Sequence, residues 1–288
     1  MSNKDLLDNI KKLREMTGVG FKDCKIALDE TKGDIEKSIE FLRKKGIAKA
    51  SKKMSRTASE GLALVKEENG QISVIEINSE TDFVAKNQDF INFCKELSEI
   101  NFSSKGDLNK INASKMDDGS LVKDSLVNLI AKIGEKITIR RANFFDNSTG
   151  SNYFYVHSAI EKNIGKIISV VKLDATSKEK KNEIGTKIAM HIAASNPLAI
   201  DIDDIDKKIV EKELEIIKAE ITNSGKPADM AEKISKGKIS KFLNDNSLLN
   251  QLWIMDPKKK VKDILKENSL DKELKILDFI KYKVGEGV

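Results

Sequence analysis

The chain has 288 residues, with 51 lysines and arginines against 46 aspartates and glutamates, which gives a formal net charge of +5. This length predicts about two domains, and the 39% hydrophobic content is typical of a globular rather than a disordered chain. No apolar run approaches the roughly 20 residues that cross a bilayer, and the charged N-terminus is unlike a signal peptide, so a cytoplasmic protein is expected.

The first 46 residues are predicted to form three short helices. Apolar residues recur at helical spacing before a glycine-containing break at residues 17–20. A second helix is predicted from Phe21, and Asp34 is well placed to cap a third. Residues 1–46 are therefore expected to form a compact three-helix domain.

The apolar period then stops, and residues 44–59 carry six basic residues and no acidic residue. The favoured interpretation is a solvated basic linker over residues 47–60, and the alternative is a basic arm that contacts nucleic acid. Only five of the 51 basic residues are arginine, the residue best suited to phosphate and base contacts. No nucleic-acid partner is therefore expected to be required.

Strand-like alternation replaces the helical period after residue 60. Asn69-Gly70 lies between two alternating apolar runs, and this pair is a strong hairpin signal because both residues tolerate positive φ. Amphipathic helices are predicted around residues 90–97 and 120–133, followed by a strand at Ile137–Phe145. These elements are expected to form one core subdomain over residues 61–148.

The same order of elements returns in the second half of the chain. Strands are predicted at residues 153–157 and 164–173 with a turn between them, followed by a helix from near Ser177 to Ser195. Two hairpin-plus-helix units in succession predict an α+β fold with a duplicated core, two subdomains and antiparallel sheets.

The pattern of charged and apolar residues changes over residues 204–243. Two highly charged helices with narrow apolar seams flank a break at residues 223–227, which is typical of an antiparallel helical, coiled-coil-like hairpin. Such a finger would project from the core, and it could pair two copies of the chain as a homodimer. The remaining segments, 149–203 and 244–288, are predicted to form the second core subdomain.

Enzyme motifs are missing from the sequence. It contains no GxxxxGK[ST] phosphate loop and no HExxH, GxSxG or CxxC signature. Cys24 and Cys94 lie at core spacing and are predicted to be buried, reduced thiols. The sequence contains only two histidines, His157 and His191, which is too few for most catalytic-histidine and metal-binding schemes. A binding protein without cofactor or metal is expected, and not an enzyme.

The segment from Thr81 to Val84 places apolar side chains at a strand-to-helix corner, where loops are usually polar. In one interpretation, Thr81 or Asp82 caps the following helix and Phe83 folds back into the core. In the other, Phe83 and its acidic neighbour are held outward for a partner protein, as aromatic anchors of interfaces are.

The segment Thr81-Asp82-Phe83-Val84-Ala85-Lys86 resembles the hallmark of the bacterial elongation factor Ts family. Further matches follow the family order over essentially the whole chain, at residues 13–20, 23–25, 131–135, 188–195 and 225–227. The resemblance implies a guanine-nucleotide exchange factor for elongation factor Tu, which binds Tu with GDP or without nucleotide and promotes GDP release in translation elongation. It also implies a ubiquitin-associated-like (UBA-like) N-terminal domain and a coiled-coil insertion.

The resemblance further implies which residues touch the partner. Asp82 and Phe83 would press on the nucleotide domain of Tu and disturb its Mg²⁺ and phosphate site, with Thr81 and Val84 fixing the corner. Additional contacts are implied for Ile133, Gly134, His157, Arg14, Phe21 and Lys22. His191 is predicted to be a packed histidine rather than a contact. The sequence stops without the C-terminal helical module of many family members, so contacts made by that module are not expected.

Overall fold

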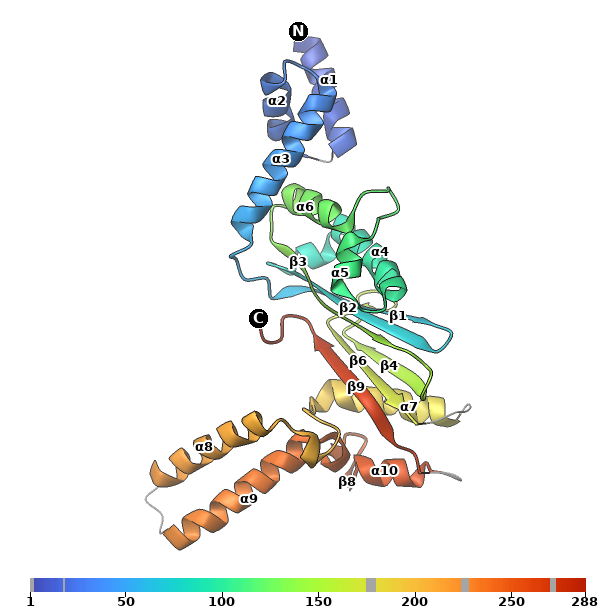
Figure 1. Cartoon of the computed structure of the whole chain (residues 1–288), viewed down its shortest axis with the longest axis vertical. Coiled ribbons are helices and arrows are strands. Elements are labelled where there is room, and N and C mark those ends of the chain that lie inside the picture. The colour runs from blue at the N-terminus through green and yellow to red at the C-terminus, as the bar shows by residue number, and fades with distance from the viewer. Residues whose placement is uncertain (1–2, 18, 175–179, 224–227, 270–272) are drawn as a thin grey trace.

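The computed structural model describes residues 3–17, 19–174, 180–223, 228–269 and 273–288. It shows a helical unit at the N-terminal end, two stacked sheets with helices on their outer faces, and a pair of long helices that projects to one side (Figure 1). The predicted α+β class with antiparallel sheets is confirmed. The division of the chain into domains stays a prediction.

The N-terminal unit consists of α1 (Asn3–Thr17), α2 (Phe21–Glu30) and α3 (Ile35–Lys53). Asp34 caps α3 as predicted, since its Oδ1 accepts a hydrogen bond of 3.0 Å from the backbone N–H of Lys37. The small core of this unit contains buried Cys24, also as predicted. Its other buried members are Ile10, Leu13, Ala27, Leu28 and Leu42.

Helix α3 continues through much of the segment predicted to be a linker. The structure is helical as far as Lys53, so the predicted linker over residues 47–60 is wrong for residues 47–53. The reason is that small residues form the packing stripe here. Ala50 lies in the apolar cluster of the first subdomain, and a Cβ built on Gly46 would lie 3.3 Å from that of Ala131. A larger residue at this position would require the two helices to move apart by a few tenths of an ångström, so glycine favours the close approach.

The first sheet has the strand order β3-β2-β1-β5, with β1 (Glu60–Glu68), β2 (Gln71–Ser79), β3 (Ile137–Phe145) and β5 (Ile164–Gly165). The predicted hairpin is confirmed, and its turn residues Asn69 and Gly70 have φ values of 53° and 78°. The outer face of this sheet is covered by α4 (Gln88–Ser104), α5 (Leu108–Ala113) and α6 (Val122–Ile133). Helix α5 was not predicted, because six residues are too few for a periodic signal.

The second sheet has the order β4-β6-β9, with β4 (Ser151–His157), β6 (Ile167–Leu173) and β9 (Ile276–Lys283). Helices α7 (Lys180–Ser195) and α10 (Val261–Glu267) cover its outer face. In both sheets the second strand of a hairpin is central and a later strand joins it, in agreement with the predicted duplication. The predicted start of α7 near Ser177 lies outside the described residues.

The two sheets face each other across a second apolar layer. Along β2, Ile72 and Val74 point to this layer while Ile75 and Ile77 point to the helices, as the two-residue period of a strand requires. Residues 72–79 are therefore buried on both faces of the sheet. The molecule is thus a four-layer arrangement of helices, sheet, sheet and helices, with an apolar cluster between each pair of successive layers (Figure 1).

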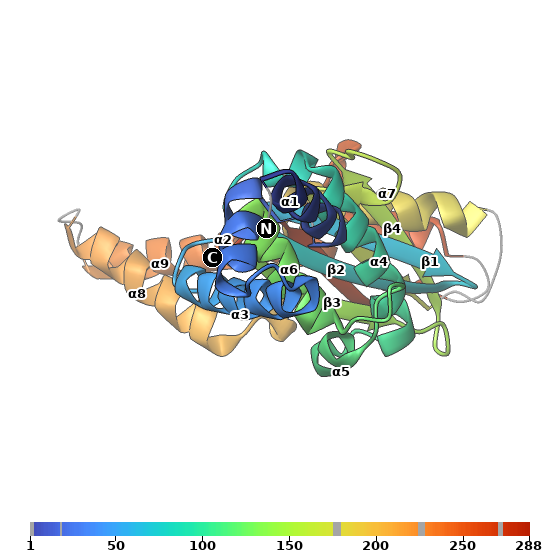
Figure 2. The ribbon, with the colours of Figure 1, turned by 90° about the horizontal axis from the view of Figure 1, so that it is seen from above.

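The projecting pair consists of α8 (Lys207–Asn223) and α9 (Ala228–Asn246), which lie side by side in both views (Figures 1 and 2). Ile217 and Ile221 are buried in the seam between them. This confirms the predicted antiparallel helical hairpin, although the predicted break falls largely on residues 224–227, outside the described ranges. No helix in the described parts of the chain is long and apolar enough to cross a membrane.

His191 is fully buried on α7, where it connects the core to a small ribbon of β7 (Leu252–Trp253) and β8 (Asp256–Lys260). Its ring stacks on that of Trp253 with centroids 5.2 Å apart. The Ile254 N–H donates to Nδ1 over 3.4 Å, so Nε2 carries the proton and donates to Gln251 Oε1 over 3.0 Å. The prediction of a packed histidine is confirmed, and the ring is neutral.

This packing makes the stability of the protein sensitive to mild acid. Burial lowers the pKa of His191, and the hydrogen bond with Gln251 opposes that effect only in part. Below about pH 6.5 the unfolded chain takes up a proton that the folded chain refuses. The free energy of unfolding then falls by at most about 1.4 kcal/mol per pH unit from this residue.

We expect urea unfolding between pH 7.5 and 5.5 to show a smaller loss of stability for His191→Gln than for wild type. His157→Gln, at an exposed histidine, is the matched control and should retain the wild-type pH dependence. Equal pH dependence in all three proteins would contradict the assignment to His191.

Candidate functional site

Phe83 is 77% exposed, more than any other large apolar side chain in the described parts of the molecule. It lies in the corner of residues 80–83, which joins β2 to a short 3-10 turn, η1 (Val84–Lys86). The next two residues, Val84 and Ala85, are buried in the apolar cluster under the first sheet. An exposed phenyl ring beside two buried residues indicates a docking position, because the ring gains burial only from another molecule.

The interpretation in which Phe83 folds into the core is wrong. Helix α4 is capped by Asn87, whose Oδ1 accepts hydrogen bonds from the N–H groups of Asp89 and Phe90 over 2.9 and 3.3 Å. Neither Thr81 nor Asp82 caps this helix. The intervening turn η1 moves the start of the helix along the chain and leaves the corner as a separate feature.

Asp82 lies beside Phe83 and carries a negative charge. Its Oδ2 is 2.8 Å from Nζ of Lys86, and the hydrogen bond from Lys86 lowers the pKa of Asp82. The same ammonium group is 5.9 Å from the centre of the Phe83 ring. Both partners of this pair are exposed, so water screens it and a partner molecule can displace it at little cost. The corner thus presents an apolar ring and a carboxylate together.

Thr81 is held by hydrogen bonds on the inner side of the corner. Its N–H and Oγ1 donate to the two carboxylate oxygens of Glu135 over 3.0 and 2.8 Å. The carboxylate of Glu80 in turn accepts the backbone N–H of Lys136 over 2.6 Å. With Thr81 bonded and Val84 buried, only residues 82 and 83 project from the corner.

Ile133 and Gly134 directly precede Glu135, so the structure brings them beside the corner. Gly134 ends α6 with φ of 87°, a left-handed conformation typical of a helix C-terminus. It is exposed, and a Cβ built there would meet nothing within 4 Å. Ile133 is half-buried against the apolar cluster of the first subdomain. The open backbone at Gly134 permits close approach of another molecule.

His157 lies at the same end of the two sheets as the corner. It is exposed at the end of β4, opposite Ile167 of β6. The preceding Lys166 forms an ion pair of 2.8 Å with Glu60. Glu60 is in turn paired in the first sheet with Ser79, the last residue before the corner. The strand register therefore connects these two sites across the sheets.

Arg14, Phe21 and Lys22 are all exposed on α1 and α2, and the Phe21 side chain is 46% accessible. Figure 1 shows α1 and α2 beyond α6, away from the sheets. The structure therefore does not bring these three residues to the corner. They form a separate exposed region at the N-terminal end.

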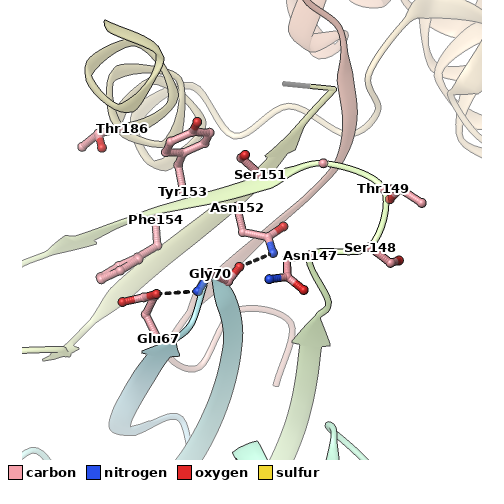
Figure 3. Close-up of a pocket in the computed structure, with 11 residues that line it drawn as sticks. Glu67, Gly70, Asn147, Ser148, Thr149, Ser151, Asn152, Tyr153, Phe154 and Thr186 are labelled. Atoms are coloured by element: carbon pink, nitrogen blue, oxygen red, sulfur yellow. Dashed lines mark hydrogen bonds between the residues drawn. The ribbon is translucent and has the colours of Figure 1, made fainter. Parts of the chain in front are cut away.

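A hollow of about 700 Å³ lies at the opposite end of the β1–β2 hairpin from the corner (Figure 3). At its edge, Gly70 N–H donates to Glu67 over 2.9 Å, and the Asn152 amide donates to Gly70 O over 2.9 Å. The remaining lining residues include none that is basic, so the hollow does not suit a phosphate ligand. The described residues also contain no group of three His, Cys, Asp or Glu side chains able to hold a metal.

The residues that support the corner carry no clear sequence signal. Glu80, Lys136 and Arg56 are charged residues among many, and their contacts form only in the folded chain. Glu135 is part of a segment with family resemblance, but its partner Thr81 is 54 residues away along the chain. The position of Glu135 directly after a helix-ending glycine was the one available indication.

Comparison with known proteins agrees with these features. A family model described as Elongation factor TS matches residues 80–286. The chain is 41% identical over 285 residues to Elongation factor Ts of Maricaulis maris, covering 97% of this chain and 91% of that protein. It is 40% identical over 283 residues to the proteins of the same name from Rickettsia felis and Rickettsia prowazekii, again covering 97% of this chain and 91% of each relative.

Proposed function

The chain belongs to the elongation factor Ts family, and from this we propose that it binds elongation factor Tu and releases GDP by disturbing the Mg²⁺ and phosphate site of Tu. Family membership supports the role in translation elongation. The observation that supports the specific mechanism is the 77% exposed ring of Phe83 beside Asp82 on a corner held at both sides.

The mechanism requires no covalent step on this chain. A Mg²⁺ ion in the nucleotide site of Tu would supply positive charge that favours binding of the GDP phosphates. Insertion of Phe83 against Tu would displace the groups that support the ion and weaken its hold on GDP. Covering the ring supplies about 2 kcal/mol, and Asp82 adds a charge-assisted hydrogen bond. The chain would therefore act as an exchange factor and not as an enzyme.

Binding of the factor and of GDP must oppose each other equally. If the chain weakens the affinity of Tu for GDP by some factor, GDP weakens the affinity of Tu for the chain by the same factor. The chain would thus bind nucleotide-free Tu more tightly than Tu with GDP, and incoming nucleotide would release it. This reciprocity lets one copy act repeatedly, in the cytoplasm where elongation occurs.

The other implied contacts extend this interface. We place Ile133 and Gly134 against the same helix of Tu as the corner, because they lie directly before the supporting Glu135. His157 would contact Tu from the same end of the sheets. Arg14, Phe21 and Lys22 would dock on another helix of the nucleotide domain, since they lie apart from the corner (Figure 1).

The function is tested by mixing the chain with Tu that carries fluorescent GDP, in the presence of excess unlabelled GDP and without nucleic acid. Stopped-flow fluorescence should show release that accelerates with the concentration of the chain and saturates. A GTPase of another family is the control and should release GDP at its own rate. Release from Tu at the intrinsic rate at every concentration would refute the proposal.

A second copy of the chain is a further candidate partner, through the α8–α9 hairpin. Ile209 and Ile216 are 41% and 46% exposed and lie one heptad apart on α8, outside the seam formed by Ile217 and Ile221. We expect sedimentation at tens of micromolar to show a dimer, and the variant with Ile209→Glu and Ile216→Glu to sediment as a monomer. A monomeric wild-type protein would contradict this pairing.

A further inference from the structure

Two segments 54 residues apart in sequence exchange hydrogen bonds at the corner. Glu135 accepts the N–H of Thr81, and Glu80 accepts the N–H of Lys136 over 2.6 Å. Each segment therefore provides a carboxylate that accepts a backbone N–H of the other. We call this reciprocal pair of contacts, made by Glu80 and Glu135, the carboxylate brace.

The carboxylate brace acts on the backbone immediately before the projecting residues. Hydrogen bonds to an ionised carboxylate are roughly twice as strong as those between neutral groups. Glu135 receives two of them from Thr81, at 3.0 and 2.8 Å, which fixes both the peptide N–H and the side chain of that residue. The direction in which the chain leaves Thr81 sets the direction of Asp82 and Phe83.

The far side of the corner is fixed by burial. Val84 is 5% exposed and Ala85 is completely enclosed in the first apolar cluster. Two residues between two fixed points have few backbone conformations open to them, so little conformational entropy is left for binding to remove. The ring of Phe83 is therefore accessible and yet held in one direction.

A third segment is attached to the same brace. Arg56, which follows α3, donates to Glu80 over 3.1 Å, and Nζ of Lys136 donates to the carbonyl oxygens of Met54 and Arg56 over 2.8 Å each. Burial raises the pKa of Glu80, but the Lys136 N–H and Arg56 outweigh this effect and lower it overall. Glu80 is thus ionised at neutral pH, and the brace joins the end of α3 to the corner.

We propose that Glu80 and Glu135 are positioning residues that hold the Asp82–Phe83 corner in the orientation a partner requires, without touching the partner through their own carboxylates. The kinetic consequence of this proposal rests on the proposed function. The structural consequence, an ordered Phe83 ring in the free protein, does not depend on any partner.

The structural consequence is tested by ¹⁹F NMR with 4-fluorophenylalanine incorporated at Phe83. In the wild-type background we expect one resonance displaced from its urea-unfolded position, and in Glu135→Ala we expect it to move toward that position. Glu67→Ala is the matched control, because Glu67 also accepts a backbone N–H, over 2.9 Å, but at the far end of the same hairpin. The control spectrum should match wild type.

The kinetic consequence is tested with the same variants in the GDP-release assay. A reacting group displaced by about 1 Å can cost up to about a hundredfold in rate, so we expect Glu135→Ala to reduce the maximal release rate by tenfold to a hundredfold. The concentration giving half-maximal rate should change much less. Glu135→Gln keeps one amide oxygen for Thr81 and should recover part of the rate, while Glu67→Ala should equal wild type.

The outcomes separate the two proposals. If wild type fails to accelerate GDP release while the Phe83 resonance still responds to Glu135→Ala, the proposed function is refuted and the positioning role stands. If wild type accelerates release and Glu135→Ala changes neither the resonance nor the rate, the positioning role is refuted. A thermal unfolding curve shows whether each variant is folded. If Glu135→Ala is unfolded, Glu135→Gln and Glu80→Gln are measured in its place, by the Phe83 resonance and by the rate of GDP release.

Discussion

Replacing Asp82 and Phe83 together by alanine is expected to slow the stimulated release of GDP from elongation factor Tu by about thirtyfold or more. Loss of about 2 kcal/mol of apolar burial at Phe83 corresponds to that factor, since each 1.36 kcal/mol of barrier is about tenfold in rate. The corner is exposed, so the fold should be unaffected. Stopped-flow release and circular dichroism measure the two effects separately.

The chain offers a matched control for this double substitution. Leu277 and Asp278 are an exposed apolar–acidic pair on β9, near the pairing of Ile276 with Leu173 and therefore at the opposite end of the second sheet from His157. The variant with Leu277→Ala and Asp278→Ala should release GDP as fast as wild type. Full activity of the Asp82→Ala, Phe83→Ala protein would show that the corner is not the element that opens the nucleotide site.

Glu76→Ala is expected to destabilise the fold by about 3 kcal/mol, because it removes the buried acceptor of two half-buried arginines and of a backbone N–H. Glu76 is fully enclosed, and its oxygens lie 3.0 Å from Arg140 Nη1 and 2.5 Å from Arg141 Nε. It also accepts the Gly285 N–H over 2.9 Å, which attaches the segment after β9 to the first sheet. Urea unfolding followed by circular dichroism measures the loss.

An ion pair whose carboxylate is exposed provides the comparison. Glu99→Ala removes a surface partner of Lys66 and should cost at most about 1 kcal/mol. A loss below 1 kcal/mol in Glu76→Ala as well would mean that the buried carboxylate contributes nothing beyond a surface pair.

The same carboxylate should respond to strong acid. Burial raises the pKa of Glu76, but the Gly285 N–H and Arg141 outweigh that effect, so the pKa in the folded protein lies below the usual glutamate value. Its contribution to stability is complete above the usual value of about 4.3 and is lost as the pH falls through the folded pKa. Wild type should therefore lose more stability below pH 4 than Glu76→Gln does.

Regular elements with strong local signals could be predicted from sequence. The strand Ile137–Phe145 has the predicted bounds, and the β1–β2 hairpin forms around the predicted Asn69-Gly70 turn. In each case the signal is contained within a few residues, since alternation and positive φ are local properties. The repeated order of hairpin and helix could be predicted for the same reason.

Features that depend on packing could not be predicted. The end of α3 is one such feature, because Gly46 and Ala50 pack closely without being strongly apolar. The interpretation in which Thr81 or Asp82 caps α4 is wrong because the extra turn η1, which has no pattern of its own, moves the cap to Asn87. In both places tertiary contacts decided the boundary.

The candidate site also combines features that the sequence predicts with features that only the folded chain shows. The apolar corner drew attention to the segment Thr81–Val84, but composition alone favoured burial of Phe83, and only the resemblance to a family favoured its presentation to a partner. The exposure of that ring and the hydrogen bonds of Glu135 belong to the folded chain. Contact with Tu through the ten residues implied by the resemblance remains a proposal that the GDP-release measurements address.

The strand that leads into the corner, β2, is an internal strand of the first sheet and is buried on both faces from Ile72 to Ser79. Amides in such a strand exchange with solvent only when the whole domain opens, whereas loops open by themselves at small cost. The docking residues Asp82 and Phe83 thus follow the strand that is expected to unfold last. Opening of parts that do not contact the corner leaves its shape unchanged, and the strand that carries it should lose its structure only on global unfolding.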